Sequence, residues 1–310
     1  MQDPLEAYCH VGIVHPMAFP QCLSGEGPIL ETVSQIATDI FFSAIELTSI
    51  KDDRVRARVT EILAVAGMEV VFAAQPAVFQ RSIKLCALDS TQRQQAIQEA
   101  KQLVDEAYEL GAAIMAIPSG PDPGEADRPK AVEALVDSLK QLCDYAQEKA
   151  AERMISIALE NFDRNVDKKQ LIGPTAEASE IAETIRNEYS NFGLTIDLSH
   201  LPLLRERIDE TVLAAVDHLI HVHIGNCVSS DSNHPGYGDT HPRFGAPGGA
   251  IGPEEVRRFL EALVYAGYFK RNTPTTMPVV SFEVRPADGE DPGFVIANAK
   301  RMLTQAWAKL

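Results

Sequence analysis

Short hydrophobic runs alternate with longer amphipathic segments along the whole chain. Between the runs, apolar residues recur at helical spacing with charged residues on the opposite face, as in 91–110 and 129–153. The runs are rich in Val, Ile and Ala, which is typical of buried strands in a parallel sheet. They number eight and lie at 9–17, 41–49, 68–75, 112–119, 154–162, 192–199, 219–226 and 278–285. The order predicts repeated strand–helix units.

Helix boundary signals fall at the ends of the amphipathic segments. Asp89 precedes the segment 91–110 and Gly111 follows it, which are the usual places for a side-chain cap and a terminal glycine. Gly173-Pro174-Thr175 and Gly252-Pro253 indicate the starts of two further helices, where proline is well tolerated. These signals and the periodicity predict the same elements.

The number of units favours one architecture. Eight strand–helix units with right-handed crossovers close most economically into a (β/α)8 TIM barrel, and 310 residues suit a single domain spanning 1–310. An open, doubly wound α/β sheet is the alternative. Against it, the first strand is followed by Val14-His15-Pro16-Met17 and not by a glycine-rich dinucleotide-binding turn.

The segment 225–252 departs from the alternation. It is rich in Gly, Pro, Ser, Asn, Asp and His and has little apolar periodicity. Irregular connections of this length in compact domains usually carry function. Because it follows the seventh strand, we expect it to lie over the active-site mouth of the barrel.

The acidic composition narrows the class of partner. The chain has 28 Lys and Arg against 44 Asp and Glu, a formal charge of −16, and no compensating basic run. Such a charge repels phosphate backbones and anionic membranes, which argues against nucleic-acid and membrane partners. The five scattered cysteines, without a Cys-x-x-Cys pair, argue against disulfides or structural zinc, and the start resembles no export signal. Together these features predict a cytoplasmic protein.

Ionisable residues occur at the ends of the last four strands. They are Glu160, Asp197, His223 and Glu283. Because the carboxyl ends of barrel strands meet at one mouth, and alternation puts these side chains on the inward face, we expect them to converge. Three buried carboxylates without a cation would be forced to protonate, so the set predicts one bound divalent metal ion. Mn²⁺ is the first expectation, and Mg²⁺, Co²⁺ or Zn²⁺ are the alternatives.

Other strand ends supply candidate pocket residues. His15, Gln75 and Ser119 end the first, third and fourth strands, and Arg285 shares a face with the last metal ligand. His221 lies two residues deeper than the histidine ligand, which favours an interior, hydrogen-bonded role.

The residues around the last four strand ends resemble those of a known superfamily. The similar segments are Leu159-Glu160-Asn161-Phe162, Ile196-Asp197-Leu198-Ser199-His200, His221-Val222-His223 and Phe282-Glu283-Val284. They resemble the xylose isomerase-like superfamily, especially its sugar isomerase and ketose 3-epimerase branch. The resemblance covers nearly the whole chain, and it implies a small carbohydrate substrate and a homo-oligomer, a dimer or tetramer.

The resemblance also implies roles for individual residues. In the epimerase branch a divalent metal is held by Glu, Asp, His and Glu from strands five to eight, which correspond to the four residues named above. The two glutamates, here Glu160 and Glu283, act there as acid and base. His200 and, in the long loop, Arg243 match residues that contact substrate oxygens. One feature departs: epimerases often carry a second Glu two turns after the first, where this chain has 163–166 without one.

The expected function is that of a metal-dependent sugar or sugar-phosphate isomerase or epimerase. Its two glutamates would move a proton through a metal-stabilised enediolate. A lyase, such as a keto-sugar dehydratase or decarboxylase, is the alternative on the same site, with His200, His241 or Arg243 as acid or carboxylate clamp.

Two further classes stay open at this point. An apurinic-endonuclease-like phosphodiesterase would use His221, His234 and His241 for additional metal ions, although the negative charge disfavours DNA. A non-catalytic sugar-binding module would keep the metal site without turnover. For a phosphorylated substrate, Gly248-Gly249 and the helix start at Gly252 would supply backbone donors.

Overall fold

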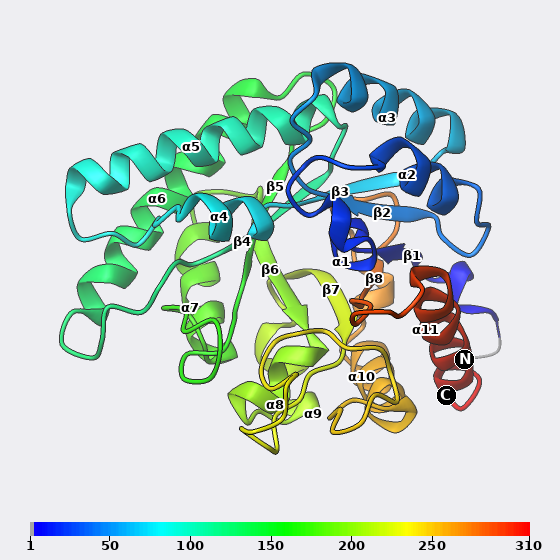
Figure 1. The fold of residues 1–310 in the computed structure, drawn as a ribbon. Coiled ribbons are helices and arrows are strands. Elements are labelled where there is room, and N and C mark those ends of the chain that lie inside the picture. Colours follow the sequence, from blue (N-terminus) through cyan, green and yellow to red (C-terminus); the bar gives the residue numbers. More distant parts are fainter. Residues whose placement is uncertain (1–2) are drawn as a thin grey trace.

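Eight parallel strands form a barrel that is surrounded by helices (Figure 1). A computed structural model describes residues 3–310, so Met1 and Gln2 of the predicted domain lie outside it. The strands are β1 (His10–Ile13), β2 (Ala44–Leu47), β3 (Glu69–Ala73), β4 (Ile114–Pro118), β5 (Ser156–Glu160), β6 (Phe192–Asp197), β7 (Leu219–Gly225) and β8 (Val279–Glu283). Their order in the sheet is β1-β8-β7-β6-β5-β4-β3-β2. The predicted α/β barrel is confirmed.

The barrel closes at a seam between β1 and β2. Val14 and Glu46 form one parallel bridge there, and the backbone N–H of Ser43 donates to the carbonyl of Val11 at 3.0 Å. By contrast, β2 and β3 pair over four successive residues. The seam therefore has weaker lateral pairing than β2 has with its other neighbour.

Helices follow the strands and cover the outside of the barrel (Figure 1). They are α1 (His15–Ala18), α2 (Ile29–Ala37), α3 (Asp53–Ala66), α4 (Gln75–Arg81), α5 (Ser90–Glu109), α6 (Arg128–Lys149), α7 (Thr175–Arg186), α8 (Leu201–Leu204), α9 (Ile208–Ala215), α10 (Pro253–Tyr265) and α11 (Pro292–Trp307). The 3₁₀ turns are η1 (Leu5–Ala7), η2 (Pro20–Cys22), η3 (Leu198–His200) and η4 (Tyr268–Lys270). The capping prediction for α5 holds, because the Asp89 side chain accepts the backbone N–H of Gln92.

Several predicted elements end sooner than expected. The predicted first and third strands run into α1 and α4, where Pro16 and Pro76 lie in the first helical turn. Proline fits there because the first turn needs no N–H donor from it, and it supplies none to a strand ladder. The predicted helix 129–153 stops at Lys149, since Ala150 turns into an extended conformation.

Side chains alternate between two layers. Outward-facing residues such as Ile157 and Leu159 belong to the continuous core that joins strands and helices. The barrel interior holds a small apolar cluster, with Ala158 among its members. Gly12 allows close packing inside, because a Cβ there would lie 2.4 Å from Ser281 Oγ. Glu46, Thr195, His221 and Ser281 are fully buried, so the interior also carries polar groups.

The long connection between β7 and α10 contains no helix or strand. It lies against the barrel mouth, since the carbonyl of His241 accepts the backbone N–H of Arg285 at 2.7 Å. Asp167, in the connection after β5, accepts the backbone N–H of Asp239 at 3.1 Å. These contacts hold the loop over the ends of β5 to β8.

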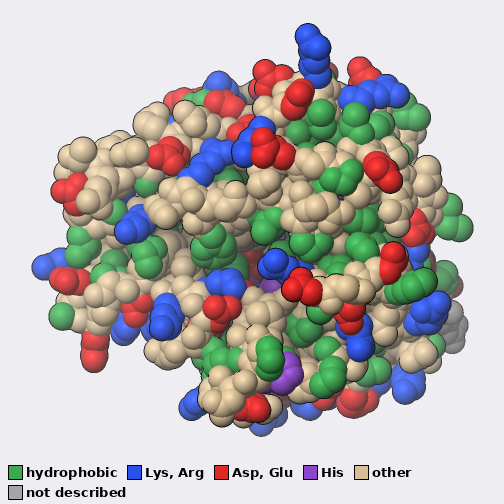
Figure 2. All heavy atoms as spheres, viewed as in Figure 1, with side chains coloured by type: hydrophobic (Ala, Val, Ile, Leu, Met, Phe, Trp, Pro, Cys, Tyr) green, Lys and Arg blue, Asp and Glu red, His purple; other side chains and the backbone are tan. Residues whose placement is uncertain are grey.

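The surface is mixed in charge. Acidic and basic side chains are interspersed over the face in Figure 2. Within residues 3–310 no helix combines the length and the apolar character that a membrane crossing requires. All five cysteines are buried and free.

Candidate active site

The ionisable residues of β5 to β8 converge at the barrel mouth. One ligand atom from each of Glu160, Asp197, His223 and Glu283 lies within 4.8 Å of the others. His223 Nδ1 is 3.3 Å from Glu160 Oε1 and 2.9 Å from Glu283 Oε2. The first three residues are fully buried, and the Glu283 side chain is 14% exposed. The predicted convergence of the four side chains is therefore present.

This set fits a divalent metal ion. Two ligands of one ion, each about 2.1 Å from it, lie about 3 Å apart. His223 Nδ1 lies at such a separation from the carboxylates of Glu160 and Glu283. Glu283 Oε2 has no hydrogen-bond partner among the described residues. Three carboxylates and an imidazole suit Mn²⁺, Mg²⁺, Co²⁺ or Zn²⁺. Burial alone would lower the pKa of His223, but Glu46, Glu283 and Glu160 raise it well above its usual range. The carboxylates around His223 therefore favour a positive charge at this position.

Glu46 on β2 orients His223 from inside the barrel. Glu46 Oε2 is 3.1 Å from His223 Nε2, and Glu46 Oε1 is 2.7 Å from His221 Nε2. Burial alone would raise the pKa of the Glu46 carboxyl, but the two imidazoles hold it below its usual range. An ionised Glu46 keeps a proton on His223 Nε2 and leaves the lone pair of Nδ1 for a metal. The interior hydrogen-bonded role predicted for His221 matches this contact.

A second buried cluster lies beside the first. Asp239 Oδ1 is 2.9 Å from His241 Nε2 and 3.3 Å from His200 Nε2. Burial alone would lower the pKa values of both histidines. Asp239 and other nearby carboxylates outweigh burial and raise the pKa to about 10 for His200 and about 9 for His241. In turn, the two histidines outweigh burial at Asp239 and hold its pKa well below the usual range.

Lys168 ties this cluster to the connection after β5. Its Nζ donates to the backbone carbonyl of Asp239 at 2.9 Å and lies 3.4 Å from Asp239 Oδ2. It also donates to Asp167 Oδ2 at 2.7 Å. Burial alone would lower the pKa of Lys168, but Asp239 and Asp167 raise it, so the ammonium stays charged.

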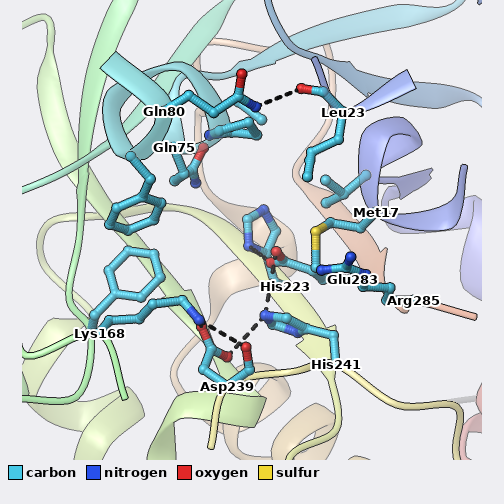
Figure 3. A pocket seen from close by; sticks show the side chains of 15 residues that line it. Met17, Leu23, Gln75, Gln80, Lys168, His223, Asp239, His241, Glu283 and Arg285 are labelled. Carbon is cyan, nitrogen blue, oxygen red and sulfur yellow. Dashed lines mark hydrogen bonds and ion pairs between the residues drawn. The ribbon is translucent and has the colours of Figure 1, made fainter. Parts of the chain in front are cut away.

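A cavity of about 170 Å³ opens beside both clusters (Figure 3). Its polar lining consists of Gln75, Gln80, Lys168, His223, Asp239, His241, Glu283 and Arg285. Its apolar lining consists of Val14, Met17, Leu23, Ala73, Pro76, Phe79 and Phe162. In Figure 3, Met17 and Leu23 lie across the cavity from Gln75 and Lys168. Charged groups and an apolar wall therefore face the same space.

The two glutamates of the four-ligand set differ in access. Glu283 lines the cavity, whereas Glu160 is not among its lining residues. Gln75 lines the cavity and donates from Nε2 to Glu160 Oε2, so it stands over that carboxylate. The Oε1 atom of Gln75 has no hydrogen-bond partner within the described part of the chain.

The predicted pocket residues divide into two groups. His241, Arg285 and Gln75 line the cavity. His200 lies behind it, with its ring 4.4 Å from that of Phe162. Ser119 points elsewhere, because its Oγ accepts the backbone N–H of Ile172 at 3.0 Å.

Two predicted substrate contacts are not brought to the cavity. His15 is buried against α2, where its Nε2 lies 2.8 Å from the hydroxyl of Thr32, and burial lowers its pKa to about 3. Arg243 donates from Nε to Glu290 Oε1 at 2.6 Å and lines a separate surface hollow. The reason is local: each side chain has a partner outside the mouth.

The glycine-rich end of the long loop does not line the cavity. The backbone N–H of Gly252 donates to Glu255 Oε2 at 2.9 Å, which closes the start of α10. Neither Gly248 nor Gly249 lines the cavity. The expected phosphate donors are therefore not among the groups that line it.

Three residues of the site were not predicted from the sequence. Glu46 could have been found from the sequence, because Ile45-Glu46-Leu47 puts a carboxylate inside a hydrophobic strand, where it needs a partner. Asp239 lies two positions before His241, a spacing that brings both to one place in an extended loop. Lys168 lies in a charged stretch that reads like solvent-exposed surface, and nothing in its sequence marks it.

The fold family follows from these strands and from a family model. The model described as xylose isomerase-like TIM barrel matches residues 35–280. The chain belongs to this family. No curated protein sequence matches the chain.

Several solved structures with similar folds are sugar epimerases. A D-psicose 3-epimerase from Clostridium cellulolyticum H10, crystallised with D-tagatose, is 18% identical, with a TM-score of 0.66 over 96% of this chain and 95% of that one. A 3-keto-D-glucoside 4-epimerase from E. coli is 16% identical, with a TM-score of 0.62 over 97% and 98%. An IOLI protein with a bound zinc atom is 16% identical, with a TM-score of 0.70 over 97% and 98%.

Proposed function

We propose that this protein is a divalent-metal-dependent sugar epimerase or isomerase. The observation that carries the proposal is the convergence of three carboxylates and His223 beside a cavity with further polar groups. The epimerases among its structural neighbours support a carbohydrate as substrate. Glu160, Asp197, His223 and Glu283 would hold the ion.

The proposed reaction moves a proton at a carbon next to a carbonyl group. The metal, when bound, draws electron density from the carbonyl and so makes that proton acidic. Glu283 faces the cavity and would take the proton or return it, and Glu160 would do the same from the side of β5. Return to the opposite face of the same carbon gives an epimer, and return to the neighbouring carbon gives an isomer.

The cavity lining would position the sugar. Gln75, Gln80 and Arg285 offer donors to hydroxyl groups. The wall formed by Met17 and Phe79 excludes water, which strengthens the electrostatic interactions inside. We propose these residues as substrate contacts.

A lyase on the same site is the second candidate. One observation favours it: His241 lines the cavity with its Nε2 3.5 Å from Glu283 Oε1, and its pKa is raised to about 9 despite burial, mainly by Asp239 and Glu283. The protonated imidazole of His241, next to Glu283, would donate its proton to the departing hydroxyl group. Glu283 would remove the proton from carbon, and water would leave from the neighbouring carbon.

The test combines metal content with a turnover screen. Elemental analysis of the metal-loaded protein should give bound Mn²⁺ that is lost or weakened in Glu283→Gln. Incubation with a panel of ketoses in D₂O should give Mn²⁺-dependent uptake of deuterium at carbon. Glu290→Gln is the matched control, since Glu290 pairs with Arg243 outside the cavity.

The outcomes separate the candidates. Deuterated ketose epimers or isomers support the proposal, and loss of water from the sugar supports the lyase. A folded wild-type protein that binds no Mn²⁺, Co²⁺ or Zn²⁺ would contradict the four-ligand site and with it both candidates.

A further inference from the structure

We propose that the substrate is a ketose that carries a second sugar ring, and that this ring binds in the surface hollow beside the cavity. The hollow, here called the outer hollow, has a volume of about 830 Å³. It is bounded by parts of 234–247 and 285–292 and by the start of η2. The inference rests on the proposed function, and it adds the size and the chemical class of the substrate.

The cavity and the outer hollow adjoin at Arg285, which lines both. Along the long connection, Asp239 and His241 line the cavity, whereas Thr240 and Pro242 line the outer hollow. The chain at these four positions therefore separates the two spaces. The backbone N–H of Arg285 donates to the carbonyl of His241 at 2.7 Å, which fixes the position of the junction.

The cavity alone is small for a ligand site. It holds about 170 Å³, whereas sites for small molecules commonly hold about 300–1,000 Å³. Glu283 and Arg285 are two positions apart, so their Cα atoms are separated by at most about 7 Å. In Figure 3, Arg285 lies beside Glu283 at the edge of the site. The far end of a ketose that reacts at Glu283 would therefore reach the junction, and a substituent there would enter the outer hollow.

The wall of the outer hollow is rigid and largely apolar. Six prolines line it: Pro20, Pro235, Pro242, Pro247, Pro286 and Pro292. A proline ring has almost no side-chain freedom to lose, so contact with a ligand costs little conformational entropy. The faces of a sugar ring present C–H groups, which pack against such a wall.

Polar groups in the lining suit the hydroxyl groups at the edge of a sugar ring. His234 Nδ1 accepts the backbone N–H of Gly236 at 3.0 Å, so in the neutral ring Nε2 carries the proton and is a donor. The Arg285 side chain is exposed and adds the donors of its guanidinium group. Both residues line the outer hollow, and hydroxyl oxygens accept from such donors.

The charges of the lining favour a neutral ligand over an anion. Arg243 Nε lies 2.6 Å from Glu290 Oε1, and Asp288 belongs to the same lining as Arg285. Two carboxylates thus offset the two arginines, so a phosphate group would gain little attraction. An alkyl chain would pack on the prolines but would leave the donors of His234 and Arg285 without acceptors. A second sugar ring fits both the apolar wall and the donors.

The experiment compares three ketoses that differ only beyond the reacting unit. They are D-fructose, D-fructose 6-phosphate and isomaltulose, in which the fructose unit carries a glucose ring at its far end. Deuterium uptake at carbon is measured with the Mn²⁺-loaded wild type, Ala287→Trp and Ala151→Trp. Ala287 is exposed and lines the outer hollow but not the cavity, so an indole ring there would fill the hollow. Ala151 is an exposed alanine before β5, at the opposite end of the barrel, and is the matched control.

The expected result is a preference for the disaccharide. In the wild type and in Ala151→Trp, kcat/KM for isomaltulose should exceed that for D-fructose at least about tenfold, mainly through KM. In Ala287→Trp this ratio should fall to about one. Equal kcat/KM values for the two sugars in the wild type would overturn the second ring and leave the proposed function standing. A ratio that persists in Ala287→Trp, or a preference for D-fructose 6-phosphate over isomaltulose, would also overturn it.

A separate measurement keeps the inference testable if the proposed function fails. That failure would appear as no deuterium uptake from any of the three ketoses. Calorimetric titration then decides, because it needs no turnover. Tighter binding of isomaltulose than of D-fructose to the wild type, lost in Ala287→Trp, supports the outer hollow as a sugar site. Equal binding of the two sugars contradicts it.

Discussion

In the two halves of the barrel mouth, the pKa values of buried histidines are shifted in opposite directions. In the half formed by β1 to β4, burial lowers the pKa of His15 to about 3, and the ring contacts the hydroxyl of Thr32 and the ring of Phe19. In the half formed by β5 to β8, burial also acts, but Asp239 and Asp197 raise the pKa of His200 to about 10. Both rings are fully buried. The carboxylates around each ring, and not its exposure, therefore set its charge.

The same division extends to the cavity lining. Every charged lining residue comes from the half with β5 to β8, whereas the apolar lining comes from the other half, Phe162 excepted. One half thus supplies the charged lining and the other supplies most of the apolar lining. Five experiments test this division, in decreasing order of effect.

Glu160→Gln should have the largest effect. It removes one of the two proposed proton carriers from the charged half, so kcat should fall about 10²–10⁴-fold. Deuterium uptake by a ketose at saturating Mn²⁺ measures it. Glu177→Gln, which removes a carboxylate that pairs with Arg164 away from the cavity, is the control. An unchanged rate in Glu160→Gln would remove Glu160 from the mechanism.

Phe79→Ala tests the apolar half. Phe79 lines the cavity and contacts Phe162 edge to face, with ring centroids 5.8 Å apart. Its loss should admit water and lower kcat/KM at least about tenfold, mainly through KM. Steady-state kinetics measures the change, and Phe294→Ala, a surface position that is 80% exposed, is the control. Equal kcat and KM in Phe79→Ala and Phe294→Ala would show that Phe79 does not contribute to substrate binding.

Glu46→Gln tests whether Glu46 orients the candidate metal ligand His223. Because Glu46 fixes the proton on His223 Nε2, its loss should weaken metal affinity about 10–100-fold. Calorimetric titration with Mn²⁺ measures this. Glu69→Gln is the control, since Glu69 pairs with Arg153 at the opposite end of the barrel. Unchanged affinity in Glu46→Gln would show that His223 is held by other contacts.

His15 makes stability depend on pH. Its folded pKa of about 3 lies below the value of about 6.5 in the unfolded chain, so the unfolded state binds the proton more readily. The contribution is complete above pH 6.5 and is lost as the pH falls, by about 2 kcal/mol at pH 5. Urea unfolding at pH 7 and pH 5 should show a smaller loss in His15→Gln. An identical loss in both proteins would mean that His15 is not held neutral.

Arg243→Ala should have the smallest effect. Arg243 pairs with Glu290 at a partly exposed site, and such pairs contribute below about 1 kcal/mol. We expect kcat and KM to stay as in the wild type, whereas Arg285→Ala should raise KM. A strong loss of activity in Arg243→Ala would mean that the loop rearranges around the substrate.

The fold and the four-ligand cluster could be predicted because both depend on local pattern. Strand alternation places Glu160 and Glu283 on the inward face whatever the loops do. The position of His200 behind the cavity could not be predicted in the same way. It depends on contacts with Asn161 and Asp239 that only the folded chain brings together.

Two differences between the expected and the observed positions of side chains have a common physical cause. Arg243 has long-range partners that the sequence does not reveal, and Glu290 is 47 positions away from it. Lys168 was missed for the complementary reason, since its contact with Asp239 spans 71 positions. Long loops that fold onto each other decide such contacts, and hydrophobic periodicity carries no information about them.

The seam between β1 and β2 links the candidate metal site to the integrity of the barrel. Glu46 takes part in the single bridge there, and its carboxylate reaches across the interior to His221 and His223 on β7. An ion that bound His223 only in the folded chain would stabilise these contacts by mass action. Hydrogen exchange at Ser43, whose backbone N–H donates across the seam to Val11, should therefore slow when the protein is loaded with metal. The bound ion would then stabilise the pairing of β1 with β2, the two strands at which the sheet closes.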